Sequence, residues 1–257
     1  MNRPDCAFAY SQVRLQARLG TRPTAGDWQR MHATRDLGAL LQLADTSALA
    51  TWTQGLTARS PVHDAEQQLR RHWLASVDEV ASWQPSGWRS AVEWLRWLPW
   101  LPALEKLARA GKSPDWMRSD PLLGPIVAED PRQRAASLKR TACAPLAAGF
   151  GTPPDVAGAW LGHWRSLWPA DAGAAQELER LVRQVAAHRR ELADAPESAA
   201  STGFRARLDH RLLSAFRRNP LSPVATVAFL GMAALDLASL RGAVAIRALR
   251  SASEDAA

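Results

Sequence analysis

Apolar residues recur along the chain at helical intervals. In the segment "SPVHDAEQQLRRHWLASVDEVASW", Leu69, Trp73 and Val77 follow one another four residues apart. Residues at this spacing lie on one face of an α-helix, so the row predicts a helix with one apolar side. Similar rows are formed by Leu208, Leu212 and Phe216, and by Tyr10, Val13 and Ala17. No run of alternating β-branched residues predicts a strand, and we therefore expect an all-α fold.

Capping residues predict where several helices begin. Thr24 is followed three residues later by Asp27, a variant of the capping box that opens a helix. Asp36 can cap the next helix, "LGALLQLA", and Ser60 can cap a helix that has Pro61 at its first position. Further helices are predicted at 7–19, 156–168, 172–192, 204–216 and 223–249, the last with a flaw at Gly242.

The segment 88–111 concentrates four of the chain's twelve tryptophans and two prolines in one apolar stretch. Pro99 and Pro102 interrupt the helical hydrogen-bond pattern, so two packed helices joined at a proline hinge are predicted. The first two tryptophans fall on a helical apolar stripe, which favours a core over a ligand-stacking surface. Trp97 and Trp100 flank a proline, and we expect them to be partly exposed, where they can anchor a protein interface or touch lipid head groups.

The clearest predicted loop separates two halves of the chain. The sequence "GKSPDWMRSDPLLGP" is rich in glycine and proline and marks a candidate boundary. We therefore divide the chain into an N-terminal helical repeat region, 1–112, and a C-terminal helical repeat region, 113–257, within one structural unit. In each half a charged amphipathic helix precedes a breaker and a more apolar helix, a pattern that favours internal repeats.

The chain is basic, because 32 Lys and Arg stand against 25 Asp and Glu, for a formal charge of +7. A basic chain favours acidic partners such as anionic head groups, acidic protein surfaces or nucleic acid. Five arginines gather in "FRARLDHRLLSAFRR" around the apolar row of that helix. This pattern predicts an amphipathic surface helix that contacts lipid or an acidic partner. Nucleic acid ranks last, since the chain has no zinc-finger, RNP-box or helix-turn-helix pattern.

No residue pattern in the chain nominates a catalytic or metal site. The six histidines are scattered without metal-ligand spacing, and no nucleophile or phosphate-loop motif occurs. Cys6 and Cys143 form no CxxC pair, which implies neither a disulfide framework nor a zinc site and fits a reducing, cytosolic compartment. The longest uncharged stretch contains Pro220 and Pro223 and is too short to span a membrane. We therefore predict no cofactor, no metal, no enzymatic activity and no transmembrane helix.

The N-terminal segment "FAYSQVRLQARLGTRPTAGDWQRMHATRDLGALLQLADT" resembles the start of a known protein family, the C/d-type subunit of V-type rotary ATPases and archaeal-type ATP synthases. The matching positions run from an aromatic-Tyr pair through two arginines to a Leu-rich helix: Tyr10, Val13, Arg14, Arg18, Leu19, Leu37, Leu40, Leu41, Asp45 and Thr46. Two later segments, "ALEKLARAG" and "LDLASLRGAVAIRAL", are similar to further family features at Leu104, Leu107, Arg109, Ala110, Asp236, Leu240 and Arg241.

The resemblance implies repeated helical bundles arranged as a funnel, and a non-catalytic role as a socket. The subunit of that family is seated on the cytoplasmic face of the membrane, where its partners are the membrane rotor ring, the central stalk and the ion-channel stator subunit. It passes torque between nucleotide chemistry and the transport of protons or sodium. The expected interface residues are Arg14, Arg18, Arg109 and Arg241 from the resemblance, and Trp97 and Trp100 from their place at the proline break.

The chain departs from the family in length and in its late helices. It is shorter, so a member with one repeat trimmed is expected, and "GMAAL" stands where a Lys-Glu pair often precedes the late Leu-Arg. These departures affect the polar lining of the socket more than the fold. The alternative function is a free-standing helical adaptor that binds nucleic acid or acidic partners through the arginines of segment 205–218.

Overall fold

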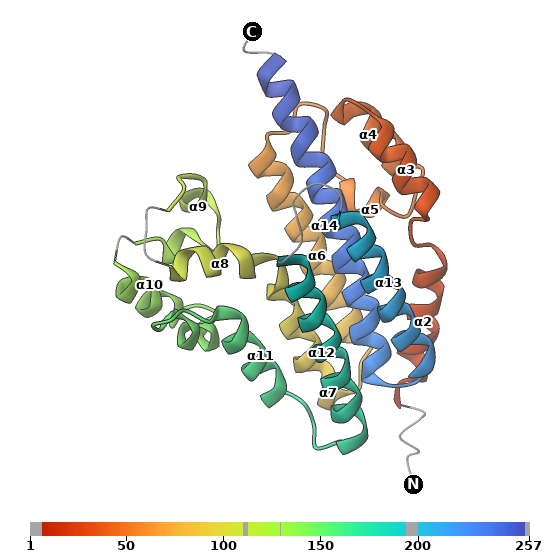
Figure 1. Cartoon of the computed structure of the whole chain (residues 1–257), viewed down its shortest axis with the longest axis vertical. Coiled ribbons are helices and arrows are strands. Elements are labelled where there is room, and N and C mark those ends of the chain that lie inside the picture. The colour runs from red at the N-terminus through yellow and green to blue at the C-terminus, as the bar shows by residue number, and fades with distance from the viewer. Residues whose placement is uncertain (1–6, 110–112, 129, 194–199, 255–257) are drawn as a thin grey trace. The chain divides into compact units, whose positions relative to one another are not determined.

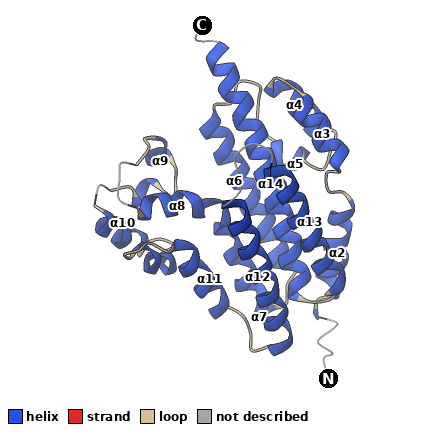
Figure 2. Cartoon of the chain, viewed as in Figure 1, coloured by secondary structure: helices blue, strands red, loops and turns tan. Residues whose placement is uncertain are grey.

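The structure is a computed structural model that describes residues 7–109, 113–128, 130–193 and 200–254. Every regular element among these residues is a helix, and no strand occurs among them (Figure 2). The prediction of an all-α fold is therefore confirmed. The funnel of repeated bundles stays a prediction.

The chain divides into two compact units. Unit 1 comprises Met1–Val92 and Ala170–Ala257, and unit 2 comprises Glu93–Pro169. The boundary predicted between residues 112 and 113 falls inside unit 2. Helix α7, Ser86–Glu93, ends at the junction of the two units.

Unit 1 is built around one long helix, α14, which runs from Pro223 to Glu254 (Figure 1). Helices α2, α4, α6, α12 and α13 all contact α14, so its apolar residues form the centre of the unit. The helices of unit 1 before α7 are α2 (Ala9–Gly20), α3 (Ala25–Ala33), α4 (Leu37–Asp45), α5 (Ala50–Thr53) and α6 (Val62–Ser82). Those after unit 2 are α12 (Ala172–Ala193), α13 (Ala200–Arg218) and α14.

The apolar composition of α14 fits its packing inside the protein. Among the described residues it is the one helix long and apolar enough to cross a membrane by length and composition alone, and 61% of its most apolar window is buried in the protein. Core helices commonly pass the same test. The flaw predicted at Gly242 is wrong, because α14 continues through this residue without a break. Helix-forming neighbours such as Arg241 and Ala243 carry the helix through the glycine.

Helix α6 has the apolar face that the sequence predicts. Leu69, Trp73 and Val77 are each buried, and Trp73 is fully so. The predicted start is wrong by one residue: Val62 is the first helical residue, and Pro61 takes the N-cap position. The hydroxyl of Ser60 instead accepts a hydrogen bond from the backbone N–H of Thr57 at 2.9 Å, so it serves the preceding turn. The predicted caps of α3 and α4, Thr24 and Asp36, are both confirmed.

Unit 2 begins with the proline hinge. Its elements are the 3₁₀ helix η1 (Trp94–Trp100), α8 (Leu101–Ala108), α9 (Trp116–Ser119), η2 (Gly124–Ile126), α10 (Pro131–Leu138), η3 (Ala144–Phe150) and α11 (Val156–Ser166). Pro99 lies within η1 and Pro102 in the first turn of α8, so the hinge predicted between two helices is a short 3₁₀ helix.

The exposure predicted for Trp100 is wrong. This tryptophan is 6% exposed, whereas Trp97 is half-buried. The two rings meet edge to face with centroids 5.9 Å apart. In a 3₁₀ helix, residues three apart lie on the same side, so the break keeps both rings together and carries Trp100 into the core. The tryptophans predicted to be core, Trp88 and Trp94, are buried.

Candidate functional site

A cavity of about 430 Å³ opens in unit 1 beside the end of α2. Its wall combines apolar side chains such as Trp52 and Phe229 with charged groups, which is typical of binding cavities. The remaining wall comes from the end of α2 and the turn after it, the α4–α5 connection, α5, α6 and α14: Arg18, Thr21, Arg22, Pro23, Ser47, Ala48, Leu49, Ala50, Thr51, His72, Ala75, Ser76, Glu79, Ala233 and Asp236.

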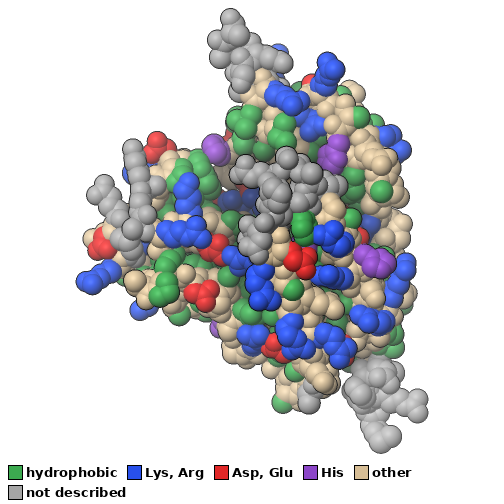
Figure 3. All heavy atoms as spheres, viewed as in Figure 1, with side chains coloured by type: hydrophobic (Ala, Val, Ile, Leu, Met, Phe, Trp, Pro, Cys, Tyr) green, Lys and Arg blue, Asp and Glu red, His purple; other side chains and the backbone are tan. Residues whose placement is uncertain are grey.

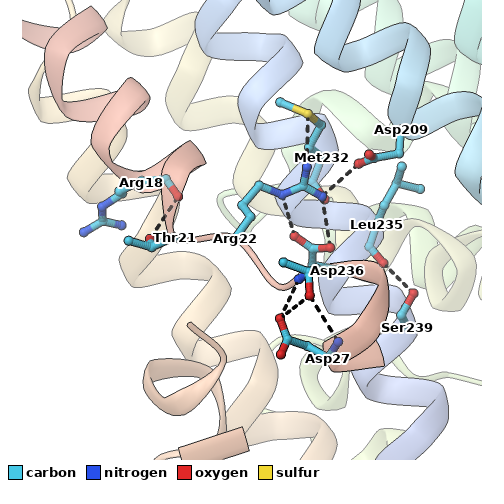
Figure 4. Close-up of polar contacts among 10 residues, drawn as sticks. Arg18, Thr21, Arg22, Asp27, Asp209, Met232, Leu235, Asp236 and Ser239 are labelled. Atoms are coloured by element: carbon cyan, nitrogen blue, oxygen red, sulfur yellow. Dashed lines mark hydrogen bonds and ion pairs between the residues drawn. The ribbon is translucent and has the colours of Figure 1, made fainter. Parts of the chain in front are cut away.

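Arg22 lies at the centre of the charged side of this cavity. Its guanidinium donates to both carboxylate oxygens of Asp236, from Nε to Oδ2 at 2.8 Å and from Nη2 to Oδ1 at 3.0 Å. The same Nη2 donates to Oδ1 of Asp209 at 2.8 Å (Figure 4). Arg22 also contacts Met232, through the sulfur at 3.3 Å and the backbone carbonyl at 3.4 Å. One arginine thus joins the turn after α2 to both α13 and α14.

Burial and pairing act in opposite directions on this cluster. Burial alone would lower the pKa of Arg22, but the hydrogen bonds and charges of Asp236 and Asp209 outweigh it and raise that pKa above its usual value. Burial raises the pKa of Asp236, and the hydrogen bond and charge of Arg22 oppose this rise without cancelling it. Arg22 therefore stabilises the charged form of Asp236 inside the protein.

Two of the predicted interface residues, Arg14 and Arg18, come together on the ring of Trp83. Their guanidinium carbons lie 5.2 Å and 5.1 Å from the ring centroid. Arg18 also forms an ion pair with Glu79 of α6, with 2.6 Å between Nη2 and Oε2. Arg14 lies over Tyr10 at 4.7 Å. Arg18 lines the cavity, and Arg14 lies one turn before it on α2.

The third predicted arginine of unit 1, Arg241, lies apart from this pair in a different ion-pair cluster. It bonds Glu66 of α6 from Nε at 2.8 Å. Glu66 also pairs with the buried Arg70, from Nε to Oε1 at 2.9 Å. Arg241 therefore fastens α14 to α6 within unit 1.

The predicted interface residues of unit 2 serve its packing. The carbonyl of Arg109 accepts a hydrogen bond from Nη1 of the buried Arg134 at 3.2 Å. The side chain of Arg109 is exposed. Arg134 also donates to the carbonyls of Leu107 at 2.8 Å and Ala128 at 2.5 Å. Trp97 and Trp100 pack on each other, as described above.

Arg247, which is also buried, fastens the end of α3 to α14. It donates to the carbonyls of Met31 and Thr34, each at 2.8 Å, at the end of α3. It also bonds the carbonyl of Ala243 at 2.7 Å. Sequence reasoning missed Arg22, Asp209 and Arg247, because their partners lie about two hundred residues away along the chain. Only Asp236 carried a signal, through the resemblance.

The described carboxylates of the site are paired with arginines, and they form no cluster of metal ligands. No group of three or more His, Cys, Asp or Glu among the described residues could hold a metal ion. Cys143 is buried, and burial raises the pKa of its thiol to about 12, so the thiol stays protonated at neutral pH. The carboxylates Asp209, Asp236 and Glu79 all pair with arginines.

Comparisons of the chain with models of protein families, with curated proteins and with solved structures find no match. The resemblance of segment 8–46 to the rotary ATPase subunit therefore stands on its own residues.

Proposed function

We propose that the chain is a non-catalytic coupling subunit of a V-type rotary ATPase or ATP synthase, seated between the central stalk and the membrane rotor ring. The sequence resemblance is the starting point of this proposal. Its matching segment folds as α2, a short α3 and the Leu-rich α4 that ends at Asp45, which is the order of elements that the resemblance implies.

The observation that carries the proposal is the use of charge within unit 1. Ion pairs join residues far apart in the chain: Arg18 with Glu79, Arg22 with Asp236, and Arg241 with Glu66. Each pair connects two different elements and resists their sliding past one another. A subunit that transmits torque needs a body that does not deform under load, and cross-links of this kind supply stiffness without any catalytic group.

Co-purification tests the proposal. A tagged chain, expressed at its native level, is extracted with its membranes in mild detergent and purified. We expect the rotor ring subunits and the central-stalk subunits to accompany it in constant ratio. Recovery of the chain without either set contradicts the proposed function.

A coupling measurement separates a mechanical role from mere attachment. We expect Arg22→Met, which removes one cross-link, to stay in the complex but to lower ion transport per ATP hydrolysed. Arg59→Met, an exposed arginine in the α5–α6 connection, is the matched control and should leave that ratio unchanged. Equal ratios in both variants would argue against a role for this cross-link in coupling.

A second candidate function is supported by the surface of α12 and α13. The positively charged side chains of these helices are all arginines, and basic side chains gather on this side of unit 1 (Figure 3). The exposed arginines of the two helices are Arg180, Arg183, Arg189, Arg190, Arg205, Arg207, Arg217 and Arg218. This surface suits an acidic partner, including nucleic acid, and supports the free-standing adaptor.

A mobility-shift assay over a salt series tests this adaptor. Binding through phosphate contacts should weaken steeply as salt rises. Arg205→Glu with Arg207→Glu should abolish it, because both arginines are exposed on α13. Absence of binding at low salt removes nucleic acid as a partner.

A further inference from the structure

Helix α2 turns its apolar row away from the protein. Tyr10 and Val13 are 58% and 67% exposed. Ala17, which continues the row one turn later, is exposed as well. The side that faces unit 1 carries the buried polar residues Ser11 and Gln12 together with the fully buried Leu15.

Both buried polar side chains of α2 form hydrogen bonds. The hydroxyl of Ser11 donates to the carbonyl of Phe8 at 2.9 Å. The side-chain oxygen of Gln12 accepts from the backbone N–H of Leu221 at 3.1 Å, in the left-handed turn before α14. The Ser11 bond lies within the first turn of α2, so the Gln12 bond and the burial of Leu15 are what fix the rotation of α2 about its axis. The exposed apolar row cannot turn inward without breaking this bond and exposing Leu15.

The positive charge of Arg14, beside the exposed row, has no carboxylate partner among the described residues. Among the described residues Arg14 contacts two aromatic rings, Tyr10 and Trp83, and pairs with no acidic group. The helix itself contains no Asp or Glu. Its other arginine, Arg18, is neutralised by Glu79. The exposed face thus combines apolar contact area with one uncompensated positive charge held in place by rings.

We propose that this outward face of α2, formed by Tyr10, Val13, Arg14 and Ala17, docks an amphipathic helix of another protein that sets a carboxylate against Arg14. Exposed apolar surface beside polar groups marks protein interfaces, and Tyr and Arg are the residue types that most often carry their binding energy. The carboxylate is required because the face supplies a positive charge and no acid.

Other occupants fit this face less well. In a symmetric pair of chains each Arg14 would lie near the Arg14 of the other copy, which places like charges in one contact. A membrane surface needs a helix that can bury a whole apolar face, whereas α2 is held to unit 1 along its other side. Nucleic acid needs several basic contacts to phosphate, and this face has one unpaired arginine. The inference concerns the chemistry of the partner and does not depend on the proposed rotor function.

Two matched synthetic peptides test the proposal on the full chain. Each has about 20 residues, long enough to form a helix in water, with leucines on one face. Glutamates flank the leucines in the acidic peptide, and lysines replace them in the basic one. Fluorescence anisotropy measures the dissociation constant of each peptide. We expect the acidic peptide to bind at least about tenfold more tightly than the basic one.

Charge reversal separates a specific contact from the general basic charge of the chain. Arg14→Glu should invert the preference between the two peptides, whereas Arg59→Glu, an exposed control of the same charge change, should leave it in place. Val13→Asp should raise the dissociation constant of the acidic peptide about tenfold, because apolar contact is lost. All three altered residues are exposed, so circular dichroism should show unchanged helix content in every variant.

Several results would overturn the proposal. Equal binding of the two peptides would do so, as would an equal effect of Arg14→Glu and Arg59→Glu. A concentration-dependent dimer in light scattering that Val13→Asp abolishes would assign the face to a second copy. Binding to vesicles of phosphatidylcholine with phosphatidylserine, lost in Val13→Asp and without any peptide preference, would assign it to a membrane. Co-purification with rotary subunits is measured separately, so this inference and the proposed function can fail independently.

Discussion

Helices α2 and α6 both pack against α14, but the predicted apolar row of α6 is buried whereas that of α2 is exposed. Helix α6 buries Leu69, Trp73 and Val77 and also pairs with α14 through Glu66 and Arg241. Helix α2 buries Leu15 on its other side, where Gln12 bonds the turn before α14. Both helices thus carry an apolar row at helical spacing, and the two rows face in opposite directions.

The comparison shows that a helical apolar row marks a contact surface without saying what it contacts. The apolar row of α6 is buried inside the chain. The row of α2 is left at the surface because the Gln12 bond and the buried Leu15, on the other side of the helix, set its orientation. Charged and polar fasteners are directional, whereas apolar burial is not, so they can hold a helix with its apolar side outward.

The largest loss in the free energy of unfolding is expected when a buried residue of α6 is replaced. Trp73→Ala should lower the free energy of unfolding by about 4 kcal/mol, because it removes a fully buried ring and leaves a cavity beside Trp52. Urea unfolding followed by circular dichroism measures the loss. A loss below about 1 kcal/mol would mean that α6 does not depend on this row.

The next effect concerns the charged fastener of the N-terminal segment. Arg22→Met should lower the free energy of unfolding by about 3 kcal/mol, because it leaves Asp236 buried without its cation. Adding Asp236→Leu should recover part of the loss, since it removes the uncompensated charge. No recovery in the double variant would show that the loss comes from packing and not from charge.

The Arg22→Met loss should depend on pH in a defined direction. The folded-state pKa of Asp236 is already raised by burial, and removal of Arg22 takes away the interaction that opposes the rise. A carboxyl group with a raised folded pKa contributes stability below its unfolded value and loses it as pH rises through the folded pKa. The gap in stability between wild type and variant should therefore be largest at neutral pH and narrow as the pH is lowered. Urea titrations at several pH values measure this gap.

Sequence patterns predicted the parts of the fold that local physics determines. The apolar row of α6 and the capping box formed by Thr24 and Asp27 depend on residues close together in the chain, and both are present. Helix α10 was missed although Asp130 and Pro131 form a standard N-cap and first position, because its eight residues show little apolar periodicity. In the sequence, a short helix of this kind can be recognised from its capping residues alone.

The candidate site was less predictable, because its geometry comes from contacts between distant segments. Arg22 and Asp236 are separated by 214 residues, and neither the spacing nor the composition around Arg22 indicates a partner. The orientation of α2 was hidden for a related reason. Gln12, which lies on the same side as the buried Leu15, bonds Leu221, a residue that only the folded chain brings near.

A smaller effect is expected from the polar fastener of α2 itself. Gln12→Ala should lower the free energy of unfolding by about 1 kcal/mol, because the backbone N–H of Leu221 loses its acceptor. Exposed Gln16→Ala, one turn later on the same helix, is the matched control and should change stability by less than about 0.5 kcal/mol. Chemical unfolding of both variants gives the difference. Equal values would mean that the Gln12 bond contributes nothing to holding α2.

The smallest effect is the sharpest test of the contrast between the two helices. Val13→Ser should change the free energy of unfolding by less than about 0.5 kcal/mol, because Val13 is exposed and Val and Ser have similar helix propensities. The same substitution in α6, Val77→Ser, should cost about 2 kcal/mol or more, since it places a hydroxyl in the core. Parallel urea titrations compare the two. If Val13→Ser proved as costly as Val77→Ser, the row of α2 would be packed within the free chain, and its availability to a partner would be lost.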